Sequence, residues 1–275
     1  MSGSPDRSRM AGTRWDPTQY MRFGDERTRP AVELLARIRH PNPRIVVDLG
    51  CGAGNITRLL AERWPAAEIV GVDHSPQMLA AAAAEPSPIR WVEADAYDWR
   101  PEAPVDVLFS NATLQWLTGH DVLVPRLMGF VAPGGWLAIQ MPLNWAAPSH
   151  RLMRETLADG GPGGGPLGAP ELRASLDVPW VAEPERYFDI LAPVATDIDI
   201  DIWETTYLHV LEGEDPVVEW VKGTGLRPVL SGLRDDERAT FLGAYARRLR
   251  EAYPRRGDGF TVFPFRRLFI VARSV

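Results

Sequence analysis

The strongest constraint on the fold of this chain is the alternation of short apolar runs with helix-forming segments between Ile45 and Met141. This rhythm is typical of βαβ units, in which each helix is the crossover between two parallel strands. Five of the runs predict strands, and three of the intervening segments predict helices. The expected fold class is therefore α/β, with a doubly wound and mostly parallel sheet.

The elements of this core can be placed from the same pattern. Strands are predicted over Ile45–Leu49, Glu68–Val72, Ile89–Val92, Val105–Phe109 and Trp136–Gln140. Helices are predicted over Ile56–Trp64, Pro76–Ala84 and Val122–Phe130. Ser75 followed by Pro76 indicates a helix start, because serine is a favoured N-cap and proline a favoured first helical residue.

The chain after Met141 no longer follows this rhythm. Residues 159–170 are so rich in Gly and Pro that no regular element is expected to persist, so we predict a mobile loop or a lid hinge there. Apolar and acidic residues alternate from Asp197 to Trp203, which predicts a strand with one wet face. Helices over 217–221 and 237–253 and a closing strand over 262–272 indicate that the core resumes after an inserted, mainly helical cap.

Length and composition bound the domain organisation. At 275 residues, of which 45% are hydrophobic, the chain can bury a sizeable core and lies near the upper limit for one domain. We predict a disordered tail over residues 1–13 and a single domain over 14–275. Within it we expect core segments over about 30–145, 197–212 and 261–275, and cap and lid segments over about 14–29, 146–196 and 213–260.

Charge and cysteine content exclude several classes of partner. A formal net charge of −6 gives no global attraction to phosphate backbones, so a small molecule is a better partner than nucleic acid or an anionic membrane. No apolar run approaches the roughly 18 residues that a membrane helix needs. Cys51 is the single cysteine, so a reducing cytoplasm is the expected compartment. The oligomeric state stays open.

The chemistry is carried by the turn after the first predicted strand. Val46 to Gly54 read V-V-D-L-G-C-G-A-G, with glycines at alternate positions where a ligand can touch the backbone. In an open parallel sheet, ligands lie beyond the carboxyl ends of the strands, where the strand order reverses. A dinucleotide fingerprint requires G-x-G-x-x-G, but here the third glycine arrives one residue early. Asp48 would repel a pyrophosphate, whereas it can approach the cationic amino group or sulfonium of S-adenosylmethionine.

Two further aspartates end predicted strands at the same edge of the sheet. Asp73 closes I-V-G-V-D, where a carboxylate can accept hydrogen bonds from both ribose hydroxyls; the alternative is a helix N-cap. Asp95 closes V-E-A-D and can accept from the adenine amino group, although a plain turn aspartate is an equal alternative. Cys51 is interpreted as a small residue that fills the loop, not as a nucleophile.

These motifs together resemble a known family. D-L-G-C-G-x-G-N, V-D-x-S-P-x-M, V-E-A-D and F-S-N-A-x-L-Q-W are similar to class I methyltransferases. Trp15 to Pro17, Arg29 to Leu35, Gln140 to Trp145, Trp203 to Tyr207 and Arg267 to Ala272 resemble the trans-aconitate 2-methyltransferase family. The resemblance covers nearly the whole chain after Gly12. Two departures from the family pattern, the Gly-rich 159–170 segment and Phe188, lie on the expected substrate side.

The resemblance implies a Rossmann-like class I methyltransferase sheet, mostly parallel with one antiparallel strand. It also implies that S-adenosylmethionine is the cofactor, that Asn111 lies near the transferred methyl group, and that the reaction esterifies a small polycarboxylate. The resulting cofactor site comprises Asp48, Gly50, Cys51, Gly52, Gly54, Asp73, His74, Met78, Asp95, Ala96 and Asn111. No metal is expected.

An acidic protein that binds a polycarboxylate needs a local cluster of cations and hydroxyls. The predicted substrate residues are Tyr20, Arg29, Trp145, His150, Tyr187, Tyr207 and Arg267. The alternatives are a solvated helix face for Arg29, a cap or surface position for His150, and core packing for the aromatic residues. Arg266 and Arg267 are adjacent on a strand, so only one can point inward. We choose Arg267 because it matches the family's motif.

The sequence therefore predicts methyl transfer from S-adenosylmethionine to a carboxylate of trans-aconitate or a related small acid. No general base is required, because the acceptor is already ionised at neutral pH. One alternative is a methyltransferase that acts on a phenolic or apolar metabolite, which the ten tryptophans favour. Another is a cofactor-binding regulator without catalysis. A hydride-transferring enzyme is disfavoured by Asn55 and Asp48.

Overall fold

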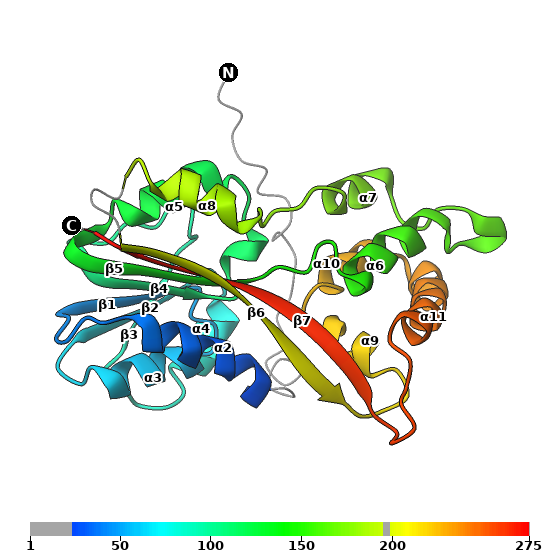
Figure 1. Ribbon diagram of the computed structural model, residues 1–275, viewed down its shortest axis with the longest axis horizontal. Helices are drawn as coiled ribbons and strands as arrows, with labels where there is room; N and C mark the ends of the chain where they lie inside the picture. Colours follow the sequence, from blue (N-terminus) through cyan, green and yellow to red (C-terminus); the bar gives the residue numbers. More distant parts are fainter. Residues whose placement is uncertain (1–23, 195–198, 275) are drawn as a thin grey trace.

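The computed structural model describes residues 24–194 and 199–274, and it is built on one seven-stranded sheet (Figure 1). The strand order is β3-β2-β1-β4-β5-β7-β6. The strands are β1 Ile45–Leu49, β2 Glu68–Asp73, β3 Arg90–Glu93, β4 Val105–Asn111, β5 Val131–Pro142, β6 Asp199–Leu211 and β7 Thr261–Arg273. The first five pair in parallel, while β7 is antiparallel to both β5 and β6. This confirms the predicted doubly wound, mostly parallel sheet.

Strand order reverses between β1 and β4, because the chain first builds outward from β1 to β3 and then returns to the other side of β1. The crossover helices are α3 Asn55–Arg63, α4 Pro76–Ala82 and α5 His120–Met128. Ser75 is the N-cap of α4, as predicted: its hydroxyl accepts a hydrogen bond from the Met78 amide at 3.3 Å. The carboxyl ends of β1 and β4 therefore diverge at the predicted ligand edge.

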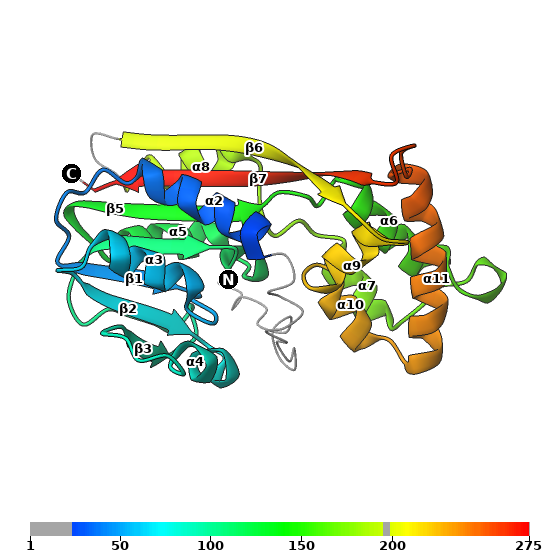
Figure 2. The same cartoon turned by 90° about the horizontal axis from the view of Figure 1, so that it is seen from below.

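Apolar residues fill both faces of the sheet. Helices α2 (Gly24–Arg37) and α3 cover one face, where Leu34, Leu60 and Phe109 are fully buried (Figure 2). Helices α5 and α8 (Pro184–Leu191) cover the other face. Although α8 belongs to the 146–196 stretch assigned to the cap, its apolar stripe packs on the sheet. The stretch predicted as cap therefore contains one helix, α8, that packs with the sheet.

The remaining helices form a separate group at the far end of the antiparallel β6–β7 pair (Figures 1 and 2). These are α6 Pro148–Asp159, α7 Pro170–Leu176, α9 Pro216–Lys222, α10 Arg227–Gly232 and α11 Asp235–Ala252. They enclose their own apolar cluster, in which Trp220, Phe241, Tyr245 and Phe263 are buried. The two long strands therefore tie the helical cap to the sheet.

Several segments differ from their predicted bounds. β5 begins at Val131, before the predicted start at Trp136, because a first pairing with β4 precedes an irregular register. β6 continues to Leu211, since the alternation of buried and exposed side chains persists beyond Trp203; residues 197 and 198 lie outside the described residues. The 159–170 segment contains one 3₁₀ turn over Pro162–Gly164.

In the part of the chain that the structure describes, no helix has the length and apolar character needed to cross a bilayer.

Candidate active site

The turn after β1 has the backbone conformation that only glycine adopts without strain. Gly50 and Gly54 have φ values of +80° and +81°. A Cβ atom on Gly50 would lie 2.1 Å from the Thr113 hydroxyl oxygen, and one on Gly54 would lie 2.5 Å from the Trp91 ring. By contrast, a Cβ on Gly52 (φ +54°) would meet nothing within 4 Å. Gly50 and Gly54 therefore permit close packing, while the backbone at Gly52 faces open space where a ligand can approach.

The turn is fastened to the end of β2. The amides of Gly50 and Cys51 donate to the Val72 carbonyl at 2.7 and 3.0 Å. The Gly52 amide donates to Asp73 Oδ2 at 2.8 Å, and the Ser75 amide donates to Asp73 Oδ1 at 2.9 Å. Each carboxylate oxygen of Asp73 is thus oriented by one backbone amide, and Oδ2 retains a further lone pair for a ligand. Since Ser75 caps α4, the N-cap alternative for Asp73 does not hold.

Asp48 lies beneath the turn and is almost completely buried. The Thr57 hydroxyl donates to Asp48 Oδ2 at 2.7 Å. Burial raises the pKa of Asp48 to about 7; the Thr57 hydrogen bond opposes this rise and the nearby Asp73 charge adds to it. Asp48 is therefore poised between its neutral and ionised forms, and a cationic ligand group nearby would favour the ionised form.

The remaining predicted cofactor residues gather around the same edge. Cys51 and Met78 are buried, and burial raises the pKa of the Cys51 thiol, so this thiol is not a nucleophile. His74 lies 3.4 Å from Asp73, whose hydrogen bond raises the pKa of the imidazole.

Asp95 Oδ1 accepts from the Tyr97 amide at 2.8 Å, which is the turn arrangement considered as the alternative. Ala96 follows it at the same edge and is half-buried.

β4 brings a polar segment across from this turn. Asn111 ends the strand, and its buried Oδ1 has no hydrogen-bond partner among the described residues. The Thr113 hydroxyl donates to the Gly50 carbonyl at 3.2 Å, so the two loops touch. Ala112 between them has a φ of +53°, a strained value for alanine. An unpartnered buried acceptor and a strained residue at this point indicate a ligand site.

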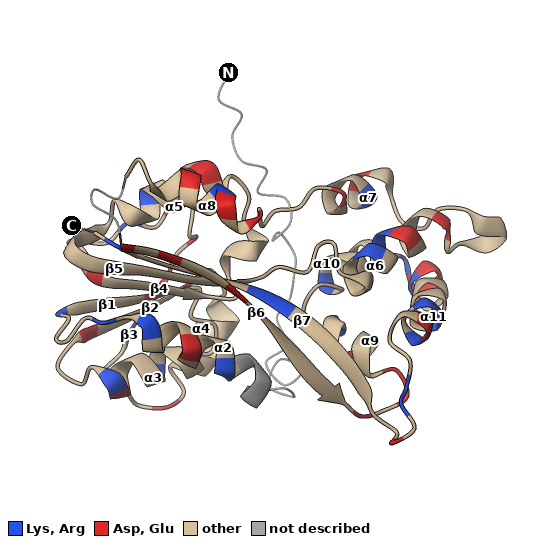
Figure 3. Ribbon diagram, viewed as in Figure 1, with Lys and Arg blue, Asp and Glu red and all other residues tan. Residues whose placement is uncertain are grey.

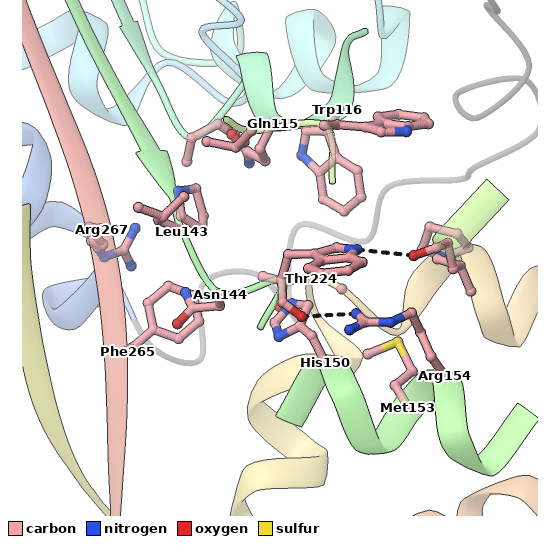
Figure 4. Close-up of a pocket in the computed structure, with 18 of the residues that line it drawn as sticks. Gln115, Trp116, Leu143, Asn144, His150, Met153, Arg154, Thr224, Phe265 and Arg267 are labelled. Atoms are coloured by element: carbon pink, nitrogen blue, oxygen red, sulfur yellow. Dashed lines mark hydrogen bonds between the residues drawn. The ribbon is translucent and has the colours of Figure 1, made fainter. Parts of the chain in front are cut away.

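A pocket extends from this β4 loop to the helical cap (Figure 4). Its lining residues come from both sides of the molecule: Ala112, Gln115, Trp116, Pro142, Leu143, Asn144, Trp145, His150, Met153, Arg154, Leu176, Val178, Trp180, Val181, Trp220, Thr224, Gly225, Pro228, Phe265 and Arg267. Three of the predicted substrate residues, Trp145, His150 and Arg267, are therefore brought together here. The pocket begins next to the predicted cofactor turn.

Arg267 is the inward-facing arginine of the adjacent pair on β7. It is 4% exposed, its guanidinium lies 4.8 Å from the centre of the Phe265 ring, and its Nη1 lies 3.4 Å from Gln140 Oε1. Arg266 points outward, where its Nε donates to Glu204 at 2.6 Å. Asn144 fixes this register, because its side-chain amide donates to the Arg266 carbonyl and its oxygen accepts from the Arg266 amide, at 2.8 and 3.0 Å.

The histidine and the second arginine of the pocket come from α6. The His150 imidazole packs close to Gly225: a Cβ there would lie 2.9 Å from its Nε2. Arg154 lies 4.0 Å from the centre of the Trp145 ring and donates to the Trp145 carbonyl at 2.9 Å. In Figure 4, Arg154 and Arg267 stand on opposite sides of the pocket. The pocket therefore offers positive charge at separated points.

The other predicted substrate residues lie outside this pocket. Tyr207 donates to Glu33 at 2.6 Å, and its ring contacts the guanidinium groups of Arg29 (4.9 Å) and Arg267 (5.7 Å). Tyr207 thus reaches the pocket through Arg267. Tyr187 is fully buried between α8 and α5, where its hydroxyl lies 2.6 Å from His120 Nδ1, so it packs the core. Tyr20 lies outside the described residues.

Several pocket residues were missed from the sequence. Gln115, Asn144, Arg154, Trp180 and Thr224 line the pocket, although none of them was predicted as a substrate residue. Gln115 stands in the F-S-N-A-x-L-Q-W motif and Asn144 in the segment Gln140 to Trp145, so the quoted motifs contained a signal for these two. For Arg154, Trp180 and Thr224 no local signal exists, because the pocket forms only when the cap folds.

The geometry of Asp73 predicts a measurable loss of cofactor binding on substitution. Asp73→Ala removes a charged acceptor held by two backbone amides, so S-adenosylmethionine affinity should fall by about 1.5 to 3 kcal/mol, the scale of hydrogen bonds to a charged group. Isothermal titration calorimetry measures this directly. An unchanged affinity in a folded Asp73→Ala protein would reject the ribose assignment.

The doubly wound sheet, the glycine turn after β1 and the acidic residue that ends β2 define a class I methyltransferase. Residues 46–135 match a family model described as a methyltransferase domain. Two solved structures share the fold. Phosphoethanolamine N-methyltransferase 2 of Haemonchus contortus, in complex with S-adenosyl-L-methionine, has a TM-score of 0.52 at 17% identity, covering 90% of this chain and 52% of that one. The YcgJ protein of Bacillus subtilis has a TM-score of 0.57 at 10% identity, covering 90% and 98%.

Relatives with much higher identity cover almost the whole chain. Trans-aconitate 2-methyltransferase of Methylobacterium radiotolerans is 48% identical over 94% of this chain and 98% of its own length. The enzymes of that name from Azoarcus sp. and Streptomyces avermitilis are 49% and 50% identical, again over 94% of this chain and over 98% and 97% of their own lengths. The chain belongs to the trans-aconitate 2-methyltransferase family. It is an S-adenosylmethionine-dependent methyltransferase, as the sequence predicted.

Proposed function

We propose that this protein transfers the methyl group of S-adenosylmethionine to a carboxylate oxygen of trans-aconitate and releases S-adenosylhomocysteine. The observation that carries the proposal is the charge of the pocket. Two arginines and a histidine line it, and none of the described lining residues is acidic. Acidic residues are spread over the rest of the ribbon (Figure 3), and the chain carries a net charge of −6. A pocket free of acids within an acidic protein favours a substrate with several carboxylates.

The residues at the edge of the sheet fit the cofactor. The backbone at Gly52 is open, Asp73 has acceptor capacity to spare, and the buried Asn111 oxygen lacks a partner among the described residues. We propose that Asp73 holds the ribose, that Asp48 faces the cationic end, and that Asn111 lies nearest the reacting atoms. The cofactor supplies an electrophilic methyl group. The protein positions the acceptor and excludes water around it.

Positioning is the main contribution that the pocket can make. The buried Arg267 on β7 and Arg154 on α6 can each bind one carboxylate of the same acid. With two carboxylates held in this way, the orientation of the third is fixed. Holding two reacting atoms roughly 3 to 3.5 Å apart replaces a bimolecular encounter and accounts for much of the rate enhancement of such reactions. No residue needs to remove a proton, because the acceptor carboxylate is ionised at neutral pH.

The rate of the chemical step should therefore be nearly independent of pH between roughly 6.5 and 9 when both substrates are saturating, since the acceptor has no proton to lose there. Single-turnover rates with trans-aconitate across this range test the proposal. Methylation of a phenol would show a rising limb instead. A tenfold rise per pH unit would contradict carboxylate esterification and favour the phenolic alternative, while no turnover of any acid would favour a non-catalytic regulator.

We also propose a cytoplasmic location and a small-molecule partner. The single cysteine is buried within the cofactor turn and carries a raised thiol pKa, which suits a reducing compartment. Acidic and basic residues are interspersed along the described ribbon (Figure 3). This distribution, together with the net negative charge, does not favour nucleic acid as a partner.

A further inference from the structure

The pocket has a second wall whose chemistry trans-aconitate leaves unused. Leu176 ends α7, and Val178, Trp180 and Val181 lie in the segment that follows; all four line the pocket. Asp177, the charged residue between them, is not part of the lining. The part of the lining that this segment contributes therefore carries no charge. A tricarboxylate presents charged groups on every arm and has no apolar group to place against this wall.

Part of this wall is held in a fixed orientation. The Trp145 indole donates to the Leu176 carbonyl at 3.2 Å, and the Arg154 guanidinium lies 4.0 Å from the centre of its ring. The side chain of Val178 is 58% exposed, so its methyl groups remain accessible. A rigid aromatic surface beside accessible aliphatic groups is the kind of lining that takes up an apolar ligand group at low entropic cost.

Two side chains that can bind a carboxylate share this pocket with the apolar segment. Arg267 on β7 and His150 at the start of α6 line the same pocket as the apolar segment, and Asn144 lies between their elements. A carboxylic acid that keeps two carboxylates and carries one flat apolar arm would therefore match both walls. Burial of that arm against indole and aliphatic carbon supplies affinity that a third carboxylate cannot.

We infer that the enzyme also esterifies dicarboxylic acids bearing an aryl-alkyl arm, with the carboxylates at Arg267 and His150 and the ring against the wall formed by Trp145, Leu176, Val178, Trp180 and Val181. The inference rests on the proposed carboxylate methylation. The carboxylate oxygen forms a bond to the methyl carbon as the carbon–sulfur bond of S-adenosylmethionine breaks, and the electron pair of that bond stays on sulfur. No proton is exchanged, and the products are a monomethyl ester and S-adenosylhomocysteine.

The test compares benzylsuccinate with succinate, because both carry two carboxylates and differ only in the apolar arm. Steady-state methylation should give a kcat/KM for benzylsuccinate at least roughly tenfold above that for succinate, the scale on which a hydrophobic pocket discriminates. Trans-aconitate is measured in parallel. A ratio near or below one, with trans-aconitate still methylated, overturns this inference and leaves the proposed function intact. If none of the three acids is methylated by a protein that binds the cofactor, the proposed function fails as well.

A matched pair of variants locates the effect. Val178→Ser removes accessible apolar surface from the wall and should lower the benzylsuccinate-to-succinate ratio at least roughly threefold, since part of a buried hydrocarbon contact is lost. Val122→Ser changes an exposed valine on α5 that does not line the pocket, and the ratio should not change. An equal ratio in the wild type and Val178→Ser would show that the arm binds elsewhere and would overturn the assignment.

Discussion

Replacement of Arg267 by alanine should raise the Michaelis constant for trans-aconitate by roughly 30- to 5000-fold, because truncation of a buried partner in a charge pair costs about 2 to 5 kcal/mol. The guanidinium is 4% exposed and lines the pocket beside Phe265, so water cannot replace it at low cost. Cofactor affinity should stay nearly the same, since β7 does not contribute to the glycine turn. Steady-state kinetics and cofactor titration measure the two effects separately.

The neighbouring arginine provides the control. Arg266 lies on the same strand but points outward, where it pairs with Glu204 and Glu183. Exposed ion pairs contribute about 0 to 1 kcal/mol to stability, so Arg266→Ala should change the Michaelis constant by little. If both variants raise the Michaelis constant equally, the effect comes from distortion of β7, and Arg267 does not bind the substrate.

Replacement of Asp48 by asparagine should stabilise the free protein at pH 8. Burial raises the pKa of Asp48 to about 7, whereas an aspartate in an unfolded chain titrates near about 3.9. Between these two values only the folded state holds the proton, so the free energy of unfolding falls as pH rises from about 4 to 7 and is constant above. Asparagine removes this penalty and can still accept from Thr57, so the melting temperature should rise at pH 8 by about 2 to 4 °C for each kcal/mol of penalty removed, and by much less at pH 5.

The same substitution should weaken the binding of S-adenosylmethionine. The neutral amide cannot attract a cationic group as a carboxylate does, so affinity at pH 8 should fall by about 1.5 to 3 kcal/mol. In the wild type, affinity should rise with pH up to about 7 and then level off, because binding of a cation favours the ionised form of Asp48. Calorimetry of both proteins at pH 6 and 8 tests this. A variant that binds the cofactor as tightly as the wild type would remove Asp48 from the site.

The sheet was largely predictable because its signals are local. The apolar run Ile45–Leu49 and the glycines after it determine β1 and its turn within ten residues, and the observed β1 has the predicted bounds. The irregular register of β5 was not predictable, since it depends on how β4 pairs with it. The position of α8 also depends on tertiary contacts. Its apolar residues Tyr187, Ile190 and Leu191 indicate that one face of the helix is buried, but they do not indicate which surface that face packs against.

The cofactor residues and the substrate pocket also differ in how far local sequence predicts them. The cofactor half is contained in short motifs, so roles for Asp48, Asp73 and Asn111 could be predicted from the sequence. The pocket is built from the loop after β4, from β5 and β7, from the cap helices and from the segment after α7, and its walls meet only in the folded chain. Alternation on a strand showed that one of Arg266 and Arg267 points inward, but the choice between them rested on the resemblance. The structure supports that choice by the burial of Arg267.

Methyl transfer to a carboxylate of trans-aconitate can be followed by the transfer of an isotopic label. The wild-type protein is incubated with trans-aconitate and with S-adenosylmethionine that carries a deuterated methyl group, and the products are analysed by mass spectrometry. We expect the mass of the acid to increase by one deuterated methyl group, and base hydrolysis to remove the label and return the free acid, as an ester requires. A protein that binds the cofactor but leaves trans-aconitate unlabelled, or a label that resists hydrolysis, would contradict the account.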